Sequence, residues 1–163
     1  MKLKLLLLVF ILSLNLNAAH QKGHTDIDIS VIANDAQKTN KTILAFFHMT
    51  HCPWCKKMLS KMYSHKDEME TINKDFYYLD INTDDTGTII FKDFKGTPKE
   101  FAKYFNIKMY PTVLFIDKGE IVYYVHGYRN IDKFNWILKY VASKSIGKMD
   151  LLEFIDEEMM KED

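Results

Sequence analysis

Two cysteines, Cys52 and Cys55, are the residues of this chain best placed to do chemistry. They are the only cysteines among 163 residues, and Pro53 and Trp54 separate them. A disulfide that closes so short a loop stabilises a fold by only about 2 kcal/mol on the chain-entropy estimate. A purely structural disulfide is therefore a weak explanation for this pair. The spacing instead favours reversible thiol chemistry at a helix start, where free backbone amides and the helix dipole stabilise a thiolate.

The segments on either side of the cysteines predict such a setting. Residues 42–49 form a continuous apolar run, which is typical of a central strand covered on both faces. Pro53 suits the first turn of a helix, because its missing N–H would be unpaired there in any case. We therefore expect Cys52 at the helix cap, with its sulfur facing free amides. Cys55 should lie one turn further in, more buried and less able to ionise.

The rest of the chain alternates helix and strand patterns, which predicts an α/β fold with helices flanking a central mixed sheet. Helices are expected at residues 29–36, 98–105, 131–143 and 149–160, and strands at 76–81, 111–117 and 120–125, with a short hairpin through 89–91. The sequence thus divides into a signal peptide at 1–19, one domain at 20–146 and an acidic amphipathic C-terminal helix at 147–163. We expect a monomer, in which the C-terminal helix packs on the body or on a partner.

The first residues have the layout of a secretory signal peptide. Lys2 and Lys4 precede an apolar run at 5–16, and Ala18 and Ala19 offer a cleavage site. The run is shorter than the roughly 20 residues that cross a membrane, although an uncleaved anchor is the alternative. We therefore expect cleavage after Ala18 or Ala19 and a periplasmic protein.

Composition narrows the function further. The chain has 22 Lys and Arg against 22 Asp and Glu, so it carries no basic excess with which to neutralise a nucleic-acid backbone. The hydrophobic fraction of 47% supplies enough material for one core. In an exported protein a lone cysteine pair is either a staple or a redox centre, and the spacing favours the second.

The order of these elements, the Cys-Pro-Trp-Cys motif, Tyr110-Pro111-Thr112 and Gly127 resemble the thioredoxin fold over residues 27–144. Residues 47–58, Gly96-Thr97 and 126–129, with Phe134 and Leu138, are most similar to exported thioredoxin-related proteins of bacterial sulfur-oxidation gene clusters. The resemblance implies that Cys52 attacks, that Cys55 resolves, and that Pro111 is a cis-proline beside the disulfide. Pro53, Trp54 and Tyr110 would support them.

Two features near the site have alternative interpretations. From the residues alone, Pro111 could simply open a hairpin strand, whereas a cis bond would leave the Tyr110 backbone free to pair with a substrate strand. Thioredoxins carry a buried Asp six residues before the first cysteine, and here that position is Phe46. A water molecule, His48 or Asp80 could take over proton transfer. Residues 84–96 form a surplus stretch that could shape the substrate surface.

The residues between the cysteines bear on the direction of electron flow. Strongly oxidising relatives carry a His there, and Trp54 has no charge, so Cys52 should be acidified less than in those proteins. We therefore expect the protein to reduce or isomerise disulfides in exported proteins without a cofactor. A membrane-borne thiol reductant would return its own disulfide to the dithiol form. His51 could favour the thiolate, and a disulfide oxidant served by a membrane-borne oxidant is the alternative.

Two other classes share these residues. His48, His51, Cys52 and Cys55 are all possible zinc or copper ligands, but neighbouring side chains at a strand end diverge, which makes convergence on one ion strained. We therefore predict no metal site. The Cys-Pro-aromatic-Cys motif also resembles a glutaredoxin site, but the Gly pair with an acidic residue that commonly follows the cis-proline strand there is absent. We expect low activity on glutathione mixed disulfides.

Overall fold

The computed structural model describes residues 26–162. The expected signal peptide and its cleavage site at Ala18 or Ala19 lie outside the described residues. No helix of the described part is long and apolar enough to span a membrane. The division of the chain at residues 19 and 146 stays a prediction.

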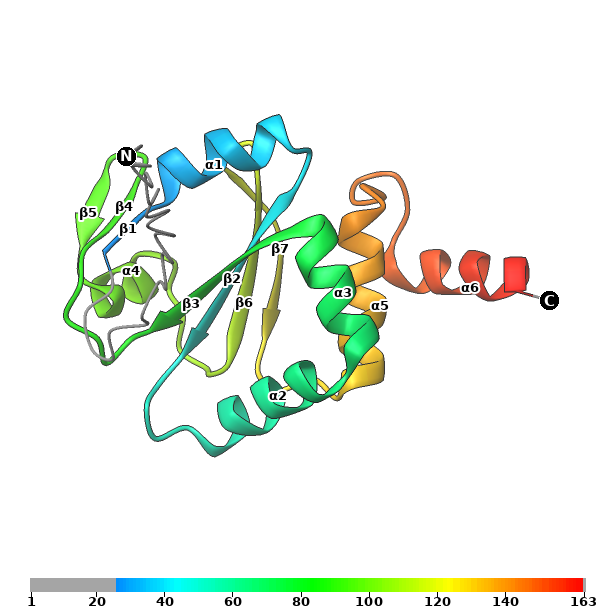
Figure 1. Ribbon diagram of the computed structural model, residues 1–163, viewed down its shortest axis with the longest axis horizontal. Coiled ribbons are helices and arrows are strands. Elements are labelled where there is room, and N and C mark those ends of the chain that lie inside the picture. The colour runs from blue at the N-terminus through cyan, green and yellow to red at the C-terminus, as the bar shows by residue number, and fades with distance from the viewer. Residues whose placement is uncertain (1–25, 163) are drawn as a thin grey trace, which may run out of the picture.

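The centre of the molecule is a four-stranded sheet in the order β3-β2-β6-β7 (Figure 1). Its strands are β2 (Thr42–His48), β3 (Phe76–Asn82), β6 (Thr112–Asp117) and β7 (Glu120–His126). β3 runs parallel to β2, while β6 is antiparallel to both β2 and β7. The first six residues of β2 are buried, as the continuous apolar run predicts for a strand covered on both faces.

Helices cover both faces of this sheet and divide the core in two (Figure 1). One half contains Phe46 and Phe115 with side chains of α2 (Pro53–Ser64), α3 (Lys66–Asp75) and α5 (Ile131–Ala142). The other half contains Phe47 with side chains of α1 (Ile29–Lys38) and α4 (Pro98–Tyr104). Alternation along β2 explains the division, because Phe46 and Phe47 point to opposite faces. The predicted mixed α/β fold is confirmed.

A second, smaller sheet departs from the single sheet that the sequence predicts. Its order is β1-β4-β5, formed by β1 (Ile27–Asp28), β4 (Ile89–Phe91) and β5 (Phe94–Gly96). The expected hairpin through 89–91 is present as β4 and β5. In addition, β4 pairs in parallel with β1, and this pairing builds a second sheet beside the main one. A two-residue strand such as β1 has no readable alternation, so the sequence could not show this pairing.

One helix is also missing from the sequence prediction. α2 ends at Ser64, the cap residue His65 is extended, and α3 begins at Lys66. Only Glu68 and Ile72 of α3 are buried. The apolar periodicity of this segment is therefore too sparse to indicate a helix from the sequence.

The C-terminal helix α6 (Leu151–Glu162) is confirmed, close to the expected range. It packs on α5 through Phe154, whose ring lies 5.4 Å from that of Tyr140, and the Tyr140 hydroxyl donates to the Met149 carbonyl at 2.7 Å. The helix then extends away from the sheet (Figure 1), and Met159 and Met160 are exposed.

Candidate active site

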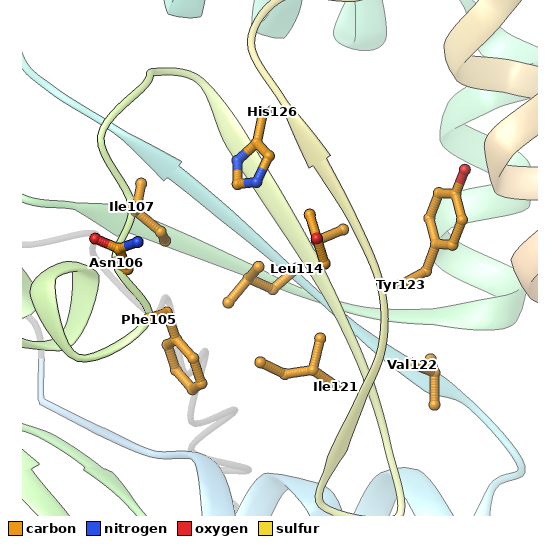
Figure 2. A pocket seen from close by; sticks show the side chains of 9 residues that line it. Phe105, Asn106, Ile107, Leu114, Ile121, Val122, Tyr123 and His126 are labelled. Atoms are coloured by element: carbon orange, nitrogen blue, oxygen red, sulfur yellow. The ribbon is translucent and has the colours of Figure 1, made fainter.

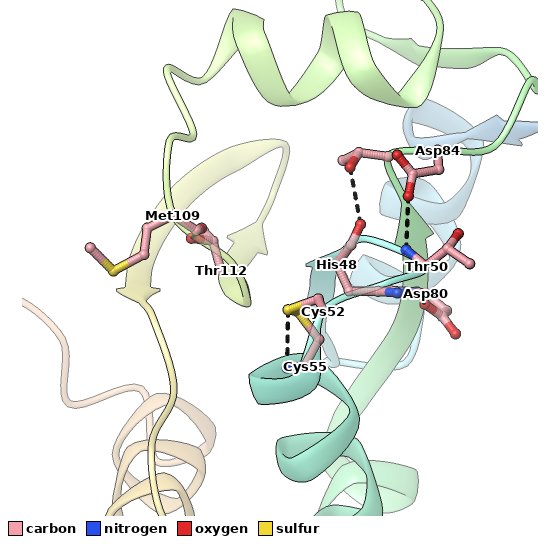
Figure 3. Close-up of a disulfide and its surroundings, with 9 residues drawn as sticks. His48, Thr50, Cys52, Cys55, Asp80, Asp84, Met109 and Thr112 are labelled. Atoms are coloured by element: carbon pink, nitrogen blue, oxygen red, sulfur yellow. Dashed lines mark hydrogen bonds and ion pairs between the residues drawn. A yellow bond between two sulfur atoms is a disulfide. The ribbon is translucent and has the colours of Figure 1, made fainter.

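The two cysteines lie at the junction predicted for them, where β2 ends and α2 begins (Figure 3). Cys52 is the cap residue of α2, with an extended backbone, and Pro53 is the first helical residue. The Cys52 Sγ accepts a hydrogen bond from the Cys55 amide at 3.1 Å. The sulfur therefore occupies the position of a capping acceptor, where the helix dipole favours a negative charge.

Cys52 and Cys55 are joined by a disulfide. Their side chains differ in access as expected, because Cys52 is 5% exposed and Cys55 only 1%. An attacking thiol must reach a partner, whereas a thiol that only attacks its neighbour need not. Of the two buried cysteines, the slightly more exposed one thus lies at the helix cap, where its thiolate is also stabilised best.

The turn between β2 and α2 is held by the end of β3 and the two residues that follow it. The Thr50 amide donates to Asp84 Oδ2 at 2.9 Å (Figure 3). The Asn82 side-chain amide donates to Thr50 Oγ1 at 3.0 Å. The Thr83 amide donates to the His48 carbonyl at 2.8 Å. Asp84, the first residue of the predicted surplus stretch, therefore helps Asn82 and Thr83 to hold the turn that carries the cysteines, a role that sequence analysis missed.

The second side of the site comes from the segment before β6. The Tyr110–Pro111 peptide bond is cis, and the Thr112 hydroxyl donates to the Met109 carbonyl at 2.7 Å. The Gly127 amide donates to the Pro111 carbonyl at 2.7 Å. Gly127 has a φ of +75°, which favours glycine, and a Cβ there would only displace the end of the exposed Met109 side chain, whose sulfur lies 2.9 Å away.

A shallow pocket of about 420 Å³ lies beside the cysteines. It is lined by Trp54, Met109, Tyr110, Gly127 and Tyr128. The Trp54 and Tyr128 rings are 5.3 Å apart. The Lys57 ammonium lies 5.2 Å from the Trp54 ring centre and 5.1 Å from that of Tyr128. Cation–π attraction thus holds a positive charge at the rim of an aromatic surface.

Two predicted supporting residues, Trp54 and Tyr110, meet in this pocket, and Pro53 and Pro111 adjoin it in the chain. Sequence analysis did not foresee the parts played by Lys57 and Tyr128. Lys57 lies three residues after Trp54, which is neighbour spacing on a helix and could have indicated that contact. Nothing in the sequence signals the approach of Tyr128, which lies beyond β7.

A larger pocket of about 730 Å³ lies over β6 and β7, between Phe105, Leu114, Ile121 and His126 (Figure 2). Neither cysteine lines it, so its size alone does not identify it as the reactive site. The reactive groups of the site are the sulfurs at the start of α2.

Behind the cysteines, an imidazole and a carboxylate form a partly buried pair. His48 Nε2 donates to Asp80 Oδ1 at 2.5 Å, and the two side chains are 16% and 31% exposed (Figure 3). Burial opposes the charged imidazole, but the hydrogen bond and charge of Asp80, with the Met49 backbone and the Asp85 charge, outweigh it and raise the pKa of His48 above 6.5. The buried Phe46, at 0% exposure, offers no proton acceptor at its own position.

The side chains around the cysteines are not arranged as a metal site. Within residues 26–162, no three His, Cys, Asp or Glu side chains are grouped so that they could hold a metal ion. The sulfurs are bonded to each other, and His48 is bonded to Asp80. The geometry therefore gives the alternative ligand set of His48, His51, Cys52 and Cys55 no support.

The fold and the paired cysteines at the start of α2 define a thiol–disulfide oxidoreductase of the thioredoxin class. The chain belongs to the family of thioredoxin-like domains, whose model matches residues 30–142. No curated protein matches the chain significantly in sequence.

Solved structures agree on the fold. A thioredoxin-fold protein from Helicobacter pylori is 18% identical, with a TM-score of 0.63, over 74% of this chain and 85% of that one. A thioredoxin from Thermus thermophilus is 21% identical, with a TM-score of 0.57, over 75% of this chain and 89% of that one.

Proposed function

We propose that this protein reduces or isomerises disulfides of other exported proteins in the periplasm. The observation that carries the proposal is the Cys52 sulfur at the cap of α2, more accessible than Cys55 and beside an aromatic pocket. The signal-peptide pattern of residues 1–19 supports the location. The closer similarity to proteins of sulfur-oxidation gene clusters stays a prediction.

The reaction follows from the two positions. The Cys52 thiolate attacks one sulfur of a substrate disulfide, which forms a mixed disulfide and releases the first substrate thiolate. Cys55 then loses its proton and attacks the Cys52 sulfur, which releases the second substrate thiolate and closes Cys52–Cys55. Two electrons pass from the protein dithiol to the substrate disulfide, and no cofactor takes part.

Trp54 supports the reducing direction. Its ring is 55% exposed, packs beside Tyr128 and carries no charge of its own. The Lys57 ammonium lies over the face of this ring, 5.2 Å from its centre. With no cation between the cysteines, the thiolate of Cys52 is stabilised mainly by the helix start, as suits a moderate reductant. Oxidation of exported proteins is the alternative direction.

The pocket beside the cysteines fits the segment that flanks a substrate disulfide. Trp54, Met109 and Tyr128 offer apolar contact, and Lys57 offers one positive charge. We propose that the Tyr110 backbone pairs with an extended substrate strand, which gives recognition with little sequence preference. A membrane-borne thiol reductant would then restore the dithiol.

Tyr128→Ala tests this surface without altering the segment between the cysteines. We expect the KM for a disulfide-linked peptide to rise about tenfold with little change in kcat, because the ring contacts the bound peptide and not the sulfurs. Tyr124→Ala is the control, since Tyr124 is 57% exposed on β7 and lies outside this pocket. Equal KM values for both variants would remove the pocket from the proposal.

The function itself is tested by single turnover. Residues 20–163, reduced with a dithiol and freed of it, should convert an equimolar disulfide peptide to two thiols and become oxidised at Cys52–Cys55. Release of no peptide thiol, with the protein dithiol intact, would contradict a reductase. Rapid oxidation of a dithiol peptide by the disulfide form would favour the opposite direction.

A further inference from the structure

The second step of the proposed reaction needs a proton acceptor that the core beneath the cysteines does not offer. Cys55 is 1% exposed, and burial disfavours its thiolate. Phe46, on the face of β2 that packs against α2, has only an apolar ring. A partly buried base elsewhere must therefore take the proton if Cys55 is to attack quickly at neutral pH.

His48 and Asp80 are brought together by the sheet. Asp80 of β3 lies opposite Phe46 in the parallel register, and Asn82 lies opposite His48. Side chains two residues apart on a strand share a face, so His48 lies on the same face as Phe46, with the two ring centres 6.1 Å apart. The pair thus lies on the α2 side of the sheet, at the end of β2 from which the cysteines follow (Figure 3).

The other charged and titratable groups around the pair are few. Asp85, beyond β3, adds a second negative charge near His48. Tyr78 of β3 feels the charge of Asp80 and lies near Tyr63 of α2, and burial raises the pKa of Tyr78, so its phenol stays neutral. At the start of α2, Lys56 and Lys57 are exposed, and Lys57 lies over the aromatic pocket. His51, next to Cys52 in the chain, is exposed, whereas the imidazole of His48 is the partly buried group on this face of the sheet that can change charge close to neutral pH.

We propose that the His48–Asp80 pair accepts the proton of Cys55 during resolution of the mixed disulfide, with Asp80 as the positioning residue. This inference rests on the proposed reductase function. The Cys55 S–H bond breaks, its proton moves to the imidazole directly or through one water, and its electron pair forms the bond to Cys52. The Cys52 bond to the substrate sulfur breaks and that sulfur leaves as a thiolate.

The direction of the pH dependence follows from the contacts. The imidazole accepts a proton only in its neutral form, so resolution accelerates as pH rises through the pKa of His48, which lies above 6.5. Asp80→Asn removes the charge that raises this pKa and leaves only a neutral hydrogen-bond acceptor, while the burial that lowers the pKa remains. The inflection should then move to lower pH, whereas His48→Gln should abolish it.

The test follows the two steps separately by quenched single turnover with a disulfide peptide, from about pH 5 to 9. We expect His48→Gln to slow release of the second peptide thiol by about 10²-fold at pH 7, with formation of the mixed disulfide unchanged. Asp80→Asn should retain fast resolution and shift its inflection downward. His65→Gln, at the opposite end of α2, is the matched control and should behave as wild type.

Each outcome decides a different claim. A wild-type pH profile in His48→Gln, with normal mixed-disulfide formation, would overturn the proton-transfer role and leave the reductase function intact. An unshifted inflection in Asp80→Asn would overturn the positioning role of Asp80. Failure of the wild-type protein to form any mixed disulfide would instead overturn the proposed function.

Discussion

Replacing Cys52 with serine is expected to abolish disulfide reduction, with a loss of at least about 10³-fold in turnover. A hydroxyl in this position is not ionised near neutral pH, so the helix start has no anion to stabilise and no mixed disulfide can form. The measurement is peptide thiol released over time by the reduced protein. Substantial turnover in this variant would exclude Cys52 as the nucleophile.

Cys55→Ala separates the two sulfurs. Cys52 stays at the cap of α2 and can still attack, but nothing resolves the product. The variant should therefore accumulate one peptide per protein in a covalent link to Cys52, visible by mass spectrometry under non-reducing conditions. Release of both peptide thiols at the wild-type rate would contradict the assignment of Cys55.

Phe101→Ala is expected to cost about 3–5 kcal/mol in the free energy of unfolding, a large part of the stability of a small domain. Phe101 is 0% exposed and connects the small sheet to the main one. Its ring centre lies 5.8 Å from those of both Phe47 and Phe91, and 5.1 Å from that of Phe94. Truncation leaves a cavity that these rings, anchored in strands, cannot fill by moving.

Urea unfolding of the oxidised protein measures this loss. Lys103→Ala, on the exposed side of the same helix, should change the free energy of unfolding by no more than about 0.5 kcal/mol. Phe101→Leu should lose less than Phe101→Ala, because it keeps more of the apolar volume. A loss below about 1 kcal/mol in the alanine variant would show that the two sheets are not joined through Phe101.

The reactive pair could be predicted from sequence because its signals are local. The apolar run before Met49, the proline after Cys52 and the two-residue spacing each bear on a short segment. The strand, the helix start and the difference in burial between Cys52 and Cys55 are all confirmed. α3 escaped prediction because few of its side chains enter the core.

The surroundings of the pair depend on distant segments and could be predicted only in part. His48 and Asp80 were both candidates, but their contact is set by the register of β2 on β3, which the sequence does not specify. The tie between Thr50 and Asp84 depends on the same register. The approach of Tyr128 to Trp54 depends on how the end of β7 turns at Gly127, 73 positions away along the chain from Trp54.

The equilibrium potential of the Cys52–Cys55 couple tests the central claim most directly. Residues 20–163 would be equilibrated in thiol–disulfide buffers of graded potential, and the free thiols trapped and counted at each. We predict a value near that of thioredoxin, about −270 mV, because Trp54 between the cysteines is uncharged and the Cys52 thiolate is stabilised mainly by the helix start. A value near −120 mV would mark a strong oxidant and contradict the reducing role.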